Sequence, residues 1–243
     1  MSTDPAGREH TAPVSASRHR SRLAGPNPGM YKHSVAVFLG ALMLFIIMSP
    51  LSERLMDSGL LEGAFLTAVM ICGVLAVGGR RTALMLVAFL AVPAVGARWL
   101  SHFWPELVPL GASHLLGVLV LAVVIVQLLK FILRAPRVDS EVLSAGIATY
   151  LVLALAWMML YLFAASIVPN AFVLADSVSK NGTLDGFHAL YFSFITLCTV
   201  GYGDIVPATP FVRMLAVLES ITGVLYMSVL IARLVTLYTS DRD

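Results

Sequence analysis

The chain has 243 residues, of which 58% are hydrophobic and 12% are charged. Soluble domains carry about a quarter charged residues, so this composition excludes an ordinary soluble protein and indicates a membrane protein. The formal net charge of +2 is too small to indicate a nucleic-acid partner. Both cysteines lie in apolar stretches, where thiols pack as small apolar groups rather than as disulfides or metal ligands.

The apolar segments predict an all-α membrane protein. Residues 1–30 are rich in Pro, Ser, Gly, Arg and His, so we expect a disordered basic tail. A hydrocarbon core about 30 Å thick needs roughly 20 apolar residues in a helix. Six runs of that length predict six transmembrane helices, at about 32–50, 60–79, 82–100, 110–133, 142–167 and 211–238.

Residues 183–204 differ from these runs, because the segment is shorter than a span and ends in a glycine-rich stretch. Non-helical backbone at membrane depth occurs only where protein or a water-filled path surrounds it. The segment therefore predicts a re-entrant loop, made of a pore helix and an extended part.

Basic residues are distributed unevenly across the predicted spans. With the N-terminus in the cytoplasm, twelve of the 16 Lys and Arg residues lie on the cytoplasmic side, and the outer side holds Arg54, Arg98, Lys180 and Arg213. Cytoplasmic loops carry an excess of Lys and Arg. We therefore expect a multi-pass protein in the lipid bilayer of the plasma membrane, with both termini cytoplasmic and the re-entrant loop open to the outer face.

A boundary between two units is predicted after residue 137, where Pro136 ends one helix and Asp139 or Ser140 caps the next. We expect a four-helix transmembrane domain at 31–137 and a pore domain at 138–243. The expected parts of the pore domain are an outer helix, a pore helix with its extended segment, and an inner helix, at 141–167, 183–204 and 211–238.

The extended part reads Thr199-Val200-Gly201-Tyr202-Gly203-Asp204. A dehydrated K⁺ ion needs a cage of oxygen atoms, which rings of backbone carbonyls can supply. Carbonyls point at one axis when the backbone alternates between right- and left-handed conformations, and glycine tolerates positive φ. We therefore expect K⁺ to bind at Thr199, Val200, Gly201 and Tyr202, with the Thr199 hydroxyl at the inner end and the side chains of Val200 and Tyr202 packed behind.

One loop supplies a quarter of each carbonyl ring, so the motif predicts a homotetramer around a fourfold axis. The C-terminal end of the pore helix carries roughly half a negative charge. Four such ends directed into one cavity favour a cation there.

Residues 183–238 resemble the pore module of the tetrameric potassium channels, and the whole chain resembles their six-helix, voltage-gated-like branch in its bacterial forms. The resemblance rests on the run from Thr196 to Asp204, followed by Pro207. It implies passive, selective conduction of K⁺. We expect no organic cofactor and no enzymatic activity, because no paired carboxylates, activated nucleophile or phosphate-binding loop occurs at a credible place in the sequence.

Two positions depart from the family pattern. The tryptophan pair usual in the pore helix is Tyr191-Phe192 in this chain, and the threonine often found before the filter threonine is Cys198. One of those tryptophans commonly hydrogen-bonds the aspartate that corresponds to Asp204. We therefore expect the Tyr191 hydroxyl to take that role.

The predicted inner helix contains further candidate residues. Aligned on the family, Gly223 falls where a glycine hinge is common, although close helix packing is an equal alternative. The same alignment makes Val224, Met227, Ser228 and Ile231 candidates for the cavity wall. Glu219 is a carboxylate deep within a predicted span. We expect it behind the filter, hydrogen-bonded to the pore helix or to a neighbouring subunit.

Residues 110–129 contain no Lys or Arg, so we expect a channel without steep voltage dependence. About five residues follow the last predicted span, so we expect no attached ligand-binding domain. Two alternatives are a potassium uptake transporter, whose chains usually join several degenerate loops, and a weakly selective cation channel, in which an acidic residue typically replaces the filter tyrosine. The single complete motif argues against the first and Tyr202 against the second. The sequence does not indicate what opens the gate.

Overall fold

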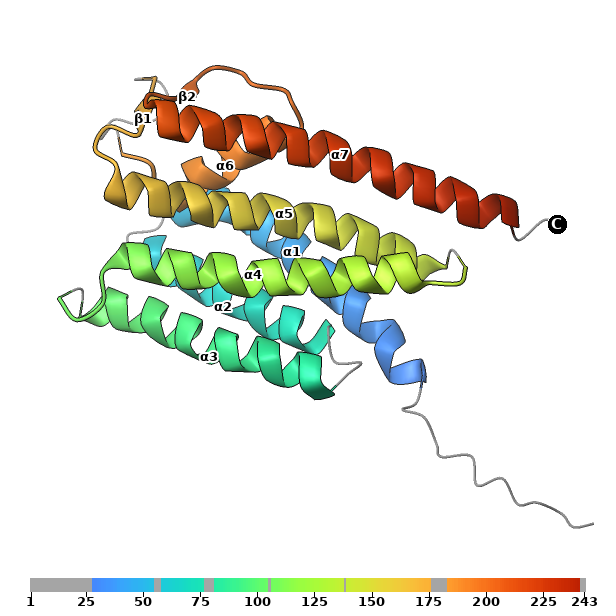
Figure 1. Cartoon of the computed structure of the whole chain (residues 1–243). Coiled ribbons are helices and arrows are strands. Elements are labelled where there is room, and N and C mark those ends of the chain that lie inside the picture. Colours follow the sequence, from blue (N-terminus) through green and yellow to red (C-terminus); the bar gives the residue numbers. More distant parts are fainter. Residues whose placement is uncertain are drawn as a thin grey trace, which may run out of the picture.

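The computed structural model describes residues 28–54, 58–76, 81–104, 106–137, 139–175 and 183–240. Helices dominate this part of the chain (Figure 1). In chain order the elements are α1 (Pro28–Arg54), α2 (Ser58–Ala76), α3 (Arg81–Phe103), α4 (Leu110–Arg134), α5 (Ser140–Ile167), β1 (Phe172–Leu174), α6 (Gly186–Leu197), β2 (Ile205–Pro207) and α7 (Pro210–Ser240).

The helix starts follow local capping signals. Asp139 caps α5, because its side chain accepts hydrogen bonds from the backbone N–H groups of Glu141 at 3.1 Å and Val142 at 2.9 Å. Helix α1 begins at Pro28, three residues before the predicted boundary at 31. Proline is favoured in the first turn of a helix. Residues 1–27 of that tail lie outside the described residues.

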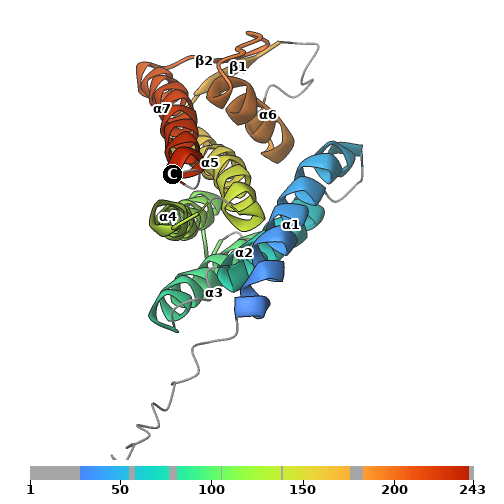
Figure 2. The same ribbon diagram turned by 90° about the vertical axis from the view of Figure 1, so that its right-hand side faces the viewer.

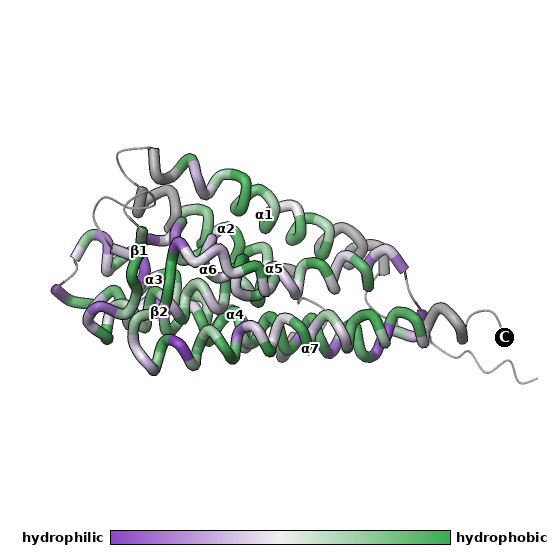
Figure 3. The backbone as a smooth tube through the Cα atoms, turned by 90° about the horizontal axis from the view of Figure 1, so that it is seen from above, coloured by the Kyte–Doolittle hydropathy of each residue, from purple (hydrophilic) through white to green (hydrophobic). Residues whose placement is uncertain are grey.

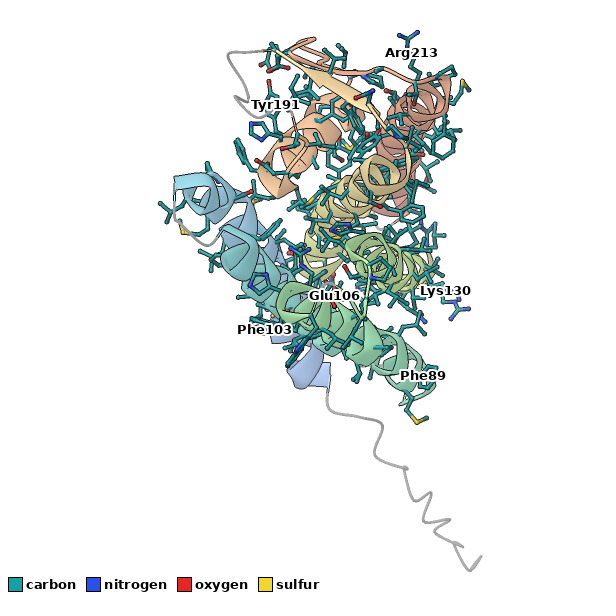
Figure 4. All side chains as sticks on the ribbon, turned by 90° about the vertical axis from the view of Figure 1, so that its left-hand side faces the viewer. Phe89, Phe103, Glu106, Lys130, Tyr191 and Arg213 are labelled. Atoms are coloured by element: carbon teal, nitrogen blue, oxygen red, sulfur yellow. The ribbon has the colours of Figure 1, made fainter. Side chains whose placement is uncertain are left out.

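Three helices in the described ranges, α4, α5 and α7, are long and apolar enough to cross a bilayer. The apolar stretches described in α1, α2 and α3 are shorter, at Val35–Leu51, Gly63–Val74 and Val87–Phe103. Hydrophobic residues fill the middle of the bundle, and strongly hydrophilic ones lie mainly toward its ends (Figure 3). Phe89 and Phe103 on α3 are exposed (Figure 4). These features are those of a membrane protein, and the six-span arrangement stays a prediction.

One hydrophobic core joins the first four helices to α5 and α6. It contains Phe38 of α1, Val124 of α4, Leu155 of α5 and Leu190 of α6. Helix α4 packs most extensively along α5, and α1 also contacts α5 and α6. Figure 2 shows α5 between α4 and the group formed by α6, α7 and the strands. The predicted boundary after residue 137 thus falls at the turn between α4 and α5, where the core is continuous.

The described part of the chain is mostly helical, as an all-α membrane protein is expected to be, and a short two-stranded antiparallel sheet is an addition that the sequence did not predict. Strands β1 and β2 pair with Val173 opposite Val206. Two further backbone hydrogen bonds extend the pairing, from Ala175 N–H to the Asp204 carbonyl and from Ala208 N–H to the Ala171 carbonyl, both at 2.9 Å. Both strands contain β-branched or aromatic residues, which favour strands. The sheet ties the chain after α5 to the chain that follows the candidate filter.

Candidate functional site

The candidate filter follows directly from α6, a short helix that other elements hold in place. Asp185 caps its start and accepts a hydrogen bond from the backbone N–H of His188 at 2.9 Å. Its apolar residues are largely buried, and the helix contacts α5, α7 and α1. Helix α6 ends at Leu197, and Cys198 is its C-cap. The packing therefore fixes the point at which the extended segment begins.

The backbone of the segment alternates in handedness. Thr199, Gly201 and Gly203 have φ values of 58°, 56° and 80°, whereas Val200 and Tyr202 between them do not have positive φ. Positive φ at alternate positions directs successive carbonyl groups to one side of the chain. Glycine adopts this conformation without steric cost, but a β-branched threonine does so rarely. Backbone strain at Thr199 is therefore part of the geometry of the segment.

Hydrogen bonds to α6 hold the inner part of the segment. The Ile195 carbonyl accepts from the backbone N–H groups of Val200 at 2.8 Å and Gly201 at 3.2 Å. The Thr196 carbonyl accepts from Thr199 N–H at 2.9 Å. The N–H groups of Thr199, Val200 and Gly201 are thus bonded to the helix behind the segment, while the side chains of Val200 and Tyr202 remain exposed in the single chain.

The outer end of the segment is tied to α6 by a side-chain hydrogen bond. The Tyr191 hydroxyl donates to Oδ2 of Asp204 at 2.7 Å, and the two groups come from α6 and from the end of the filter motif. The Tyr191 ring also stacks on Tyr202, with ring centroids 6.5 Å apart and an interplanar angle of 8°. Figure 4 shows where Tyr191 leaves α6. The hydrogen bond to Asp204 is the one predicted for Tyr191 from the sequence.

Glu219 lies behind α6 and joins three helices. Its side chain is 0% exposed. Oε1 lies 2.5 Å from the Ser193 hydroxyl of α6, and Oε2 accepts a hydrogen bond from the Tyr161 hydroxyl of α5. A buried carboxyl group with partners on α5 and α6 holds α7 to both of these helices at one point.

The Ser193 hydroxyl lies within hydrogen-bond distance of two acceptors. It is 2.8 Å from the Ala154 carbonyl of α5 and 2.5 Å from Oε1 of Glu219. A serine hydroxyl carries one proton, so it donates to one of these acceptors at a time. Ser193 therefore links the buried carboxyl group of Glu219 to the backbone of α5.

Gly223 allows the inner helix to approach the end of α6 closely. A Cβ atom at this position would overlap the Leu197 carbonyl oxygen and would lie 3.1 Å from Leu197 Cδ1. One turn earlier, the Ser220 hydroxyl donates to the Thr196 carbonyl at 3.3 Å. The contact supports the packing alternative for Gly223.

The remaining candidates face outward or lie at the inner end of the segment. Cys198 is exposed, and its Sγ lies 3.2 Å from the Tyr150 hydroxyl of α5. The four candidates for the cavity wall are all exposed on α7 in the single chain, namely Val224, Met227, Ser228 and Ile231.

Three features of the site were not predicted from the sequence. Two of them are Ser193 and Tyr161, the partners of Glu219. Each is a polar residue within an apolar helix, and this placement could have marked them as candidates. The positive φ of Thr199 had no signal, because threonine disfavours that conformation.

Residues 146–240 match a protein family described as ion channel. The chain is also similar to two-pore potassium channel 4 of Arabidopsis thaliana, with 32% identity over 98 residues, 40% of this chain and 34% of that protein. It is 42% identical over 45 residues to a voltage-gated potassium channel of Aeropyrum pernix, covering 18% of this chain and 15% of that protein. No solved structure matches the chain significantly.

The chain spans about a third or less of the length of these curated relatives. The matches confirm the predicted resemblance to potassium channels, and the matched family is one of ion channels rather than of enzymes. With three membrane-length helices in the described ranges, the chain is a membrane protein whose residues 146–240 are similar to ion channels.

Proposed function

We propose that this chain is a subunit of a potassium-selective channel that conducts K⁺ passively across the plasma membrane. The observation that carries the proposal is the alternating backbone, with positive φ at Thr199, Gly201 and Gly203. Four copies of such a backbone around an axis would form rings of carbonyl oxygens that replace the hydration shell of the ion. The match to an ion-channel family and the similarity to potassium channels support the proposal independently.

In the proposed filter, K⁺ binds to the carbonyl oxygens of Thr199, Val200, Gly201 and Tyr202 and to the Thr199 hydroxyl. Gly203 lets the chain turn outward at the end of the filter. The N–H groups of Thr199, Val200 and Gly201 are hydrogen-bonded to α6. In the proposed filter these bonds hold the segment from behind, so that its carbonyl oxygens face the ion. Electrostatic attraction by the C-terminal ends of the pore helices favours K⁺ in the cavity below.

Three side chains support this filter from behind. Tyr191 holds Asp204 at the outer end, and Glu219 holds α6 against the inner helix. Cys198 occupies the corner where α6 passes into the filter, beside Tyr150. Because the filter binds ions only when its carbonyl oxygens keep their spacing, we assign these residues to maintaining that spacing.

The proposed channel is a homotetramer. In the single chain α7 is buried along one narrow stripe, which includes Val212, Glu219, Gly223 and Tyr226, while most of its other side chains are exposed and apolar. An exposed apolar surface of this kind is typical of contact with lipid or with other protein. Fourfold assembly in a bilayer would provide such contacts for α7 and would close the filter rings.

The proposed topology has six spans, with α1 to α5 and α7 crossing the bilayer and α6 re-entering from the outer face. The length and apolarity of α4, α5 and α7 support three of the spans. The distribution of Lys and Arg supports cytoplasmic termini. We further propose that Val224, Met227, Ser228 and Ile231 line the inner cavity. We also propose that α4, which has no Lys or Arg at 110–129, does not sense voltage.

The proposal is tested by ion uptake into vesicles that contain the purified full-length protein. We expect rapid uptake of radioactive rubidium, a K⁺ substitute, with little sodium uptake. Gly203→Ala places a side chain at φ 80° and should abolish uptake. Gly40→Ala is the matched control, because a Cβ atom at Gly40 meets nothing within 4 Å.

Three results would contradict the proposal. Equal uptake of sodium and rubidium would indicate a weakly selective cation channel. Uptake that requires an energy source or a second chain would indicate a transporter subunit. Unchanged uptake by an assembled Gly203→Ala variant would remove the filter from the pathway.

A further inference from the structure

The cytoplasmic end of α4 presents backbone carbonyls that the helix itself does not satisfy. Helix α4 ends at Arg134, and Ala135 is its C-cap, with an N–H group that reaches the Ile132 carbonyl at 3.4 Å. The last four carbonyls of a helix lack intrahelical partners and carry the negative end of the helix dipole. The end of α4 is therefore a binding site for a cationic donor.

Arg233 of α7 provides that donor. Its Nη2 donates to the Leu133 carbonyl at 3.0 Å and to the Ala135 carbonyl at 3.1 Å. The two acceptors lie on either side of the last residue of α4, about 100 residues before Arg233 in the chain. Hydrogen bonds from a charged group are stronger than neutral ones. The inner helix is thus bound directly to the end of α4.

The contact with Arg233 completes a row of attachments along α7. Nearer the filter, the Tyr226 hydroxyl donates to the Gly146 carbonyl of α5 at 2.6 Å. One turn later, Leu230 lies against Gly146, where a Cβ atom would be 3.2 Å from its methyl groups. Arg233 is the next residue of the same stripe. The cytoplasmic half of α7 is therefore attached at successive turns, first to α5 at Gly146 and then to the end of α4.

The connection between α4 and α5 is short. Only residues 135–139 separate the two helices, and α4 packs along α5 over most of its length. A displacement of the end of α4 therefore reaches α7 through the Arg233 contact, without an intervening helix. For the inner helix to move independently, the guanidinium group would have to leave both carbonyls.

We propose that Arg233 is a positioning residue for the gate, coupling the cytoplasmic end of the inner helix to the end of α4. This inference rests on the proposed channel function, since it concerns the equilibrium between closed and open states. Arg233 does not touch the ion or the filter. Its substitution should change open probability and leave selectivity and single-channel conductance as they are.

The test is single-channel recording of the full-length protein in planar bilayers. Arg233→Gln removes the charge and the planar donor group. We expect it to shift the ratio of open to closed states about tenfold, which corresponds to about 1.4 kcal/mol. Arg233→Lys keeps the charge on a smaller donor group, so we expect a smaller shift, of about threefold.

Arg134→Gln is the matched control. It removes the same charge at the same end of the bundle, but Arg134 is exposed. Gating like that of the wild type is expected. An equal shift in Arg134→Gln would show that surface charge, and not the contact with α4, controls the gate, and would overturn the inference.

The other outcomes also separate the two proposals. Unchanged gating in an assembled Arg233→Gln variant overturns the coupling while leaving the channel function intact. A wild-type protein that carries no potassium-selective current overturns the proposed function itself. If Arg233→Gln does not assemble, Arg233→Lys decides: a shift of about threefold supports the coupling, and gating equal to that of the wild type overturns it.

Discussion

Replacement of Gly223 by alanine distinguishes packing from hinge bending at the centre of the inner helix. The new Cβ atom would overlap a backbone oxygen, that of Leu197, which has no rotamer by which to move away. Restoring normal contact distances requires α6 and α7 to separate locally by roughly 1 Å. Overpacking of this kind costs about 1–3 kcal/mol, which the better helix propensity of alanine offsets by about 1 kcal/mol.

Gly146→Ala is the control, because it adds the same methyl group at a different contact of α7, the one with α5. There the new Cβ atom meets the methyl groups of Leu230 at 3.2 Å, and a leucine side chain can rotate away. The gain in helix propensity then roughly balances the steric cost, and we expect almost no change in stability.

The assay combines thermal unfolding of the detergent-solubilised protein with ion-uptake measurements. Because the overlap is with a backbone atom, we expect a cost at the upper end of that range, and the net loss of about 2 kcal/mol should lower the melting temperature of Gly223→Ala by about 4–8 °C. Displacement of the end of α6 should also reduce selectivity, because Val200 and Gly201 are bonded to Ile195 of that helix. A Gly223→Ala variant with unchanged stability and selectivity but lower open probability would refute packing and support a hinge.

Three further predictions concern the outer end of the filter, the buried acid and α4. Tyr191→Phe removes the hydrogen bond to Asp204 and should speed filter inactivation by roughly ten- to a hundredfold, since a hydrogen bond to a charged group contributes about 1.5–3 kcal/mol. Unchanged inactivation kinetics in current recordings would contradict this role. Glu219→Gln keeps a donor and an acceptor beside Ser193, so stability should match the wild type, while Glu219→Leu should lose about 3 kcal/mol in unfolding experiments. A gate controlled by proton binding at Glu219 should show an open probability that depends on pH in the wild type and is independent of pH in Glu219→Gln. An unaltered pH response in Glu219→Gln would rule out this role. Since residues 110–129 contain no Lys or Arg, gating-current measurements should find less than one elementary charge per channel, and several charges per channel would contradict the account.

Much of the pore unit follows from short-range chemistry. The helix bounds at α5 and α7 come from apolar length and from Asp139 as a cap. The extended filter segment follows from glycines at alternate positions. Tyr191 reaches Asp204 as expected from the residue types at those two positions. In each case the signal lies in the feature itself or, for Tyr191 and Asp204, in two residues 13 positions apart.

What sequence analysis missed depends on contacts between distant segments. The pairing of β1 with β2 joins two three-residue strands, too short to give a periodic pattern. The contact of Arg233 with the end of α4 involves backbone carbonyls, which carry no side-chain signal. The positive φ of Thr199 is imposed by its surroundings against the preference of threonine.

The central claim is potassium selectivity, and the reversal potential of the current tests it most directly. With the purified wild-type protein in a planar bilayer and tenfold different KCl concentrations on the two sides, the current should reverse near the K⁺ equilibrium potential, about 59 mV from zero. When Na⁺ replaces K⁺ on the dilute side, the reversal potential should move further from zero, because a pore that excludes Na⁺ then faces a larger K⁺ gradient. A current that reverses near zero when K⁺ and Na⁺ face each other at equal concentration would contradict the account.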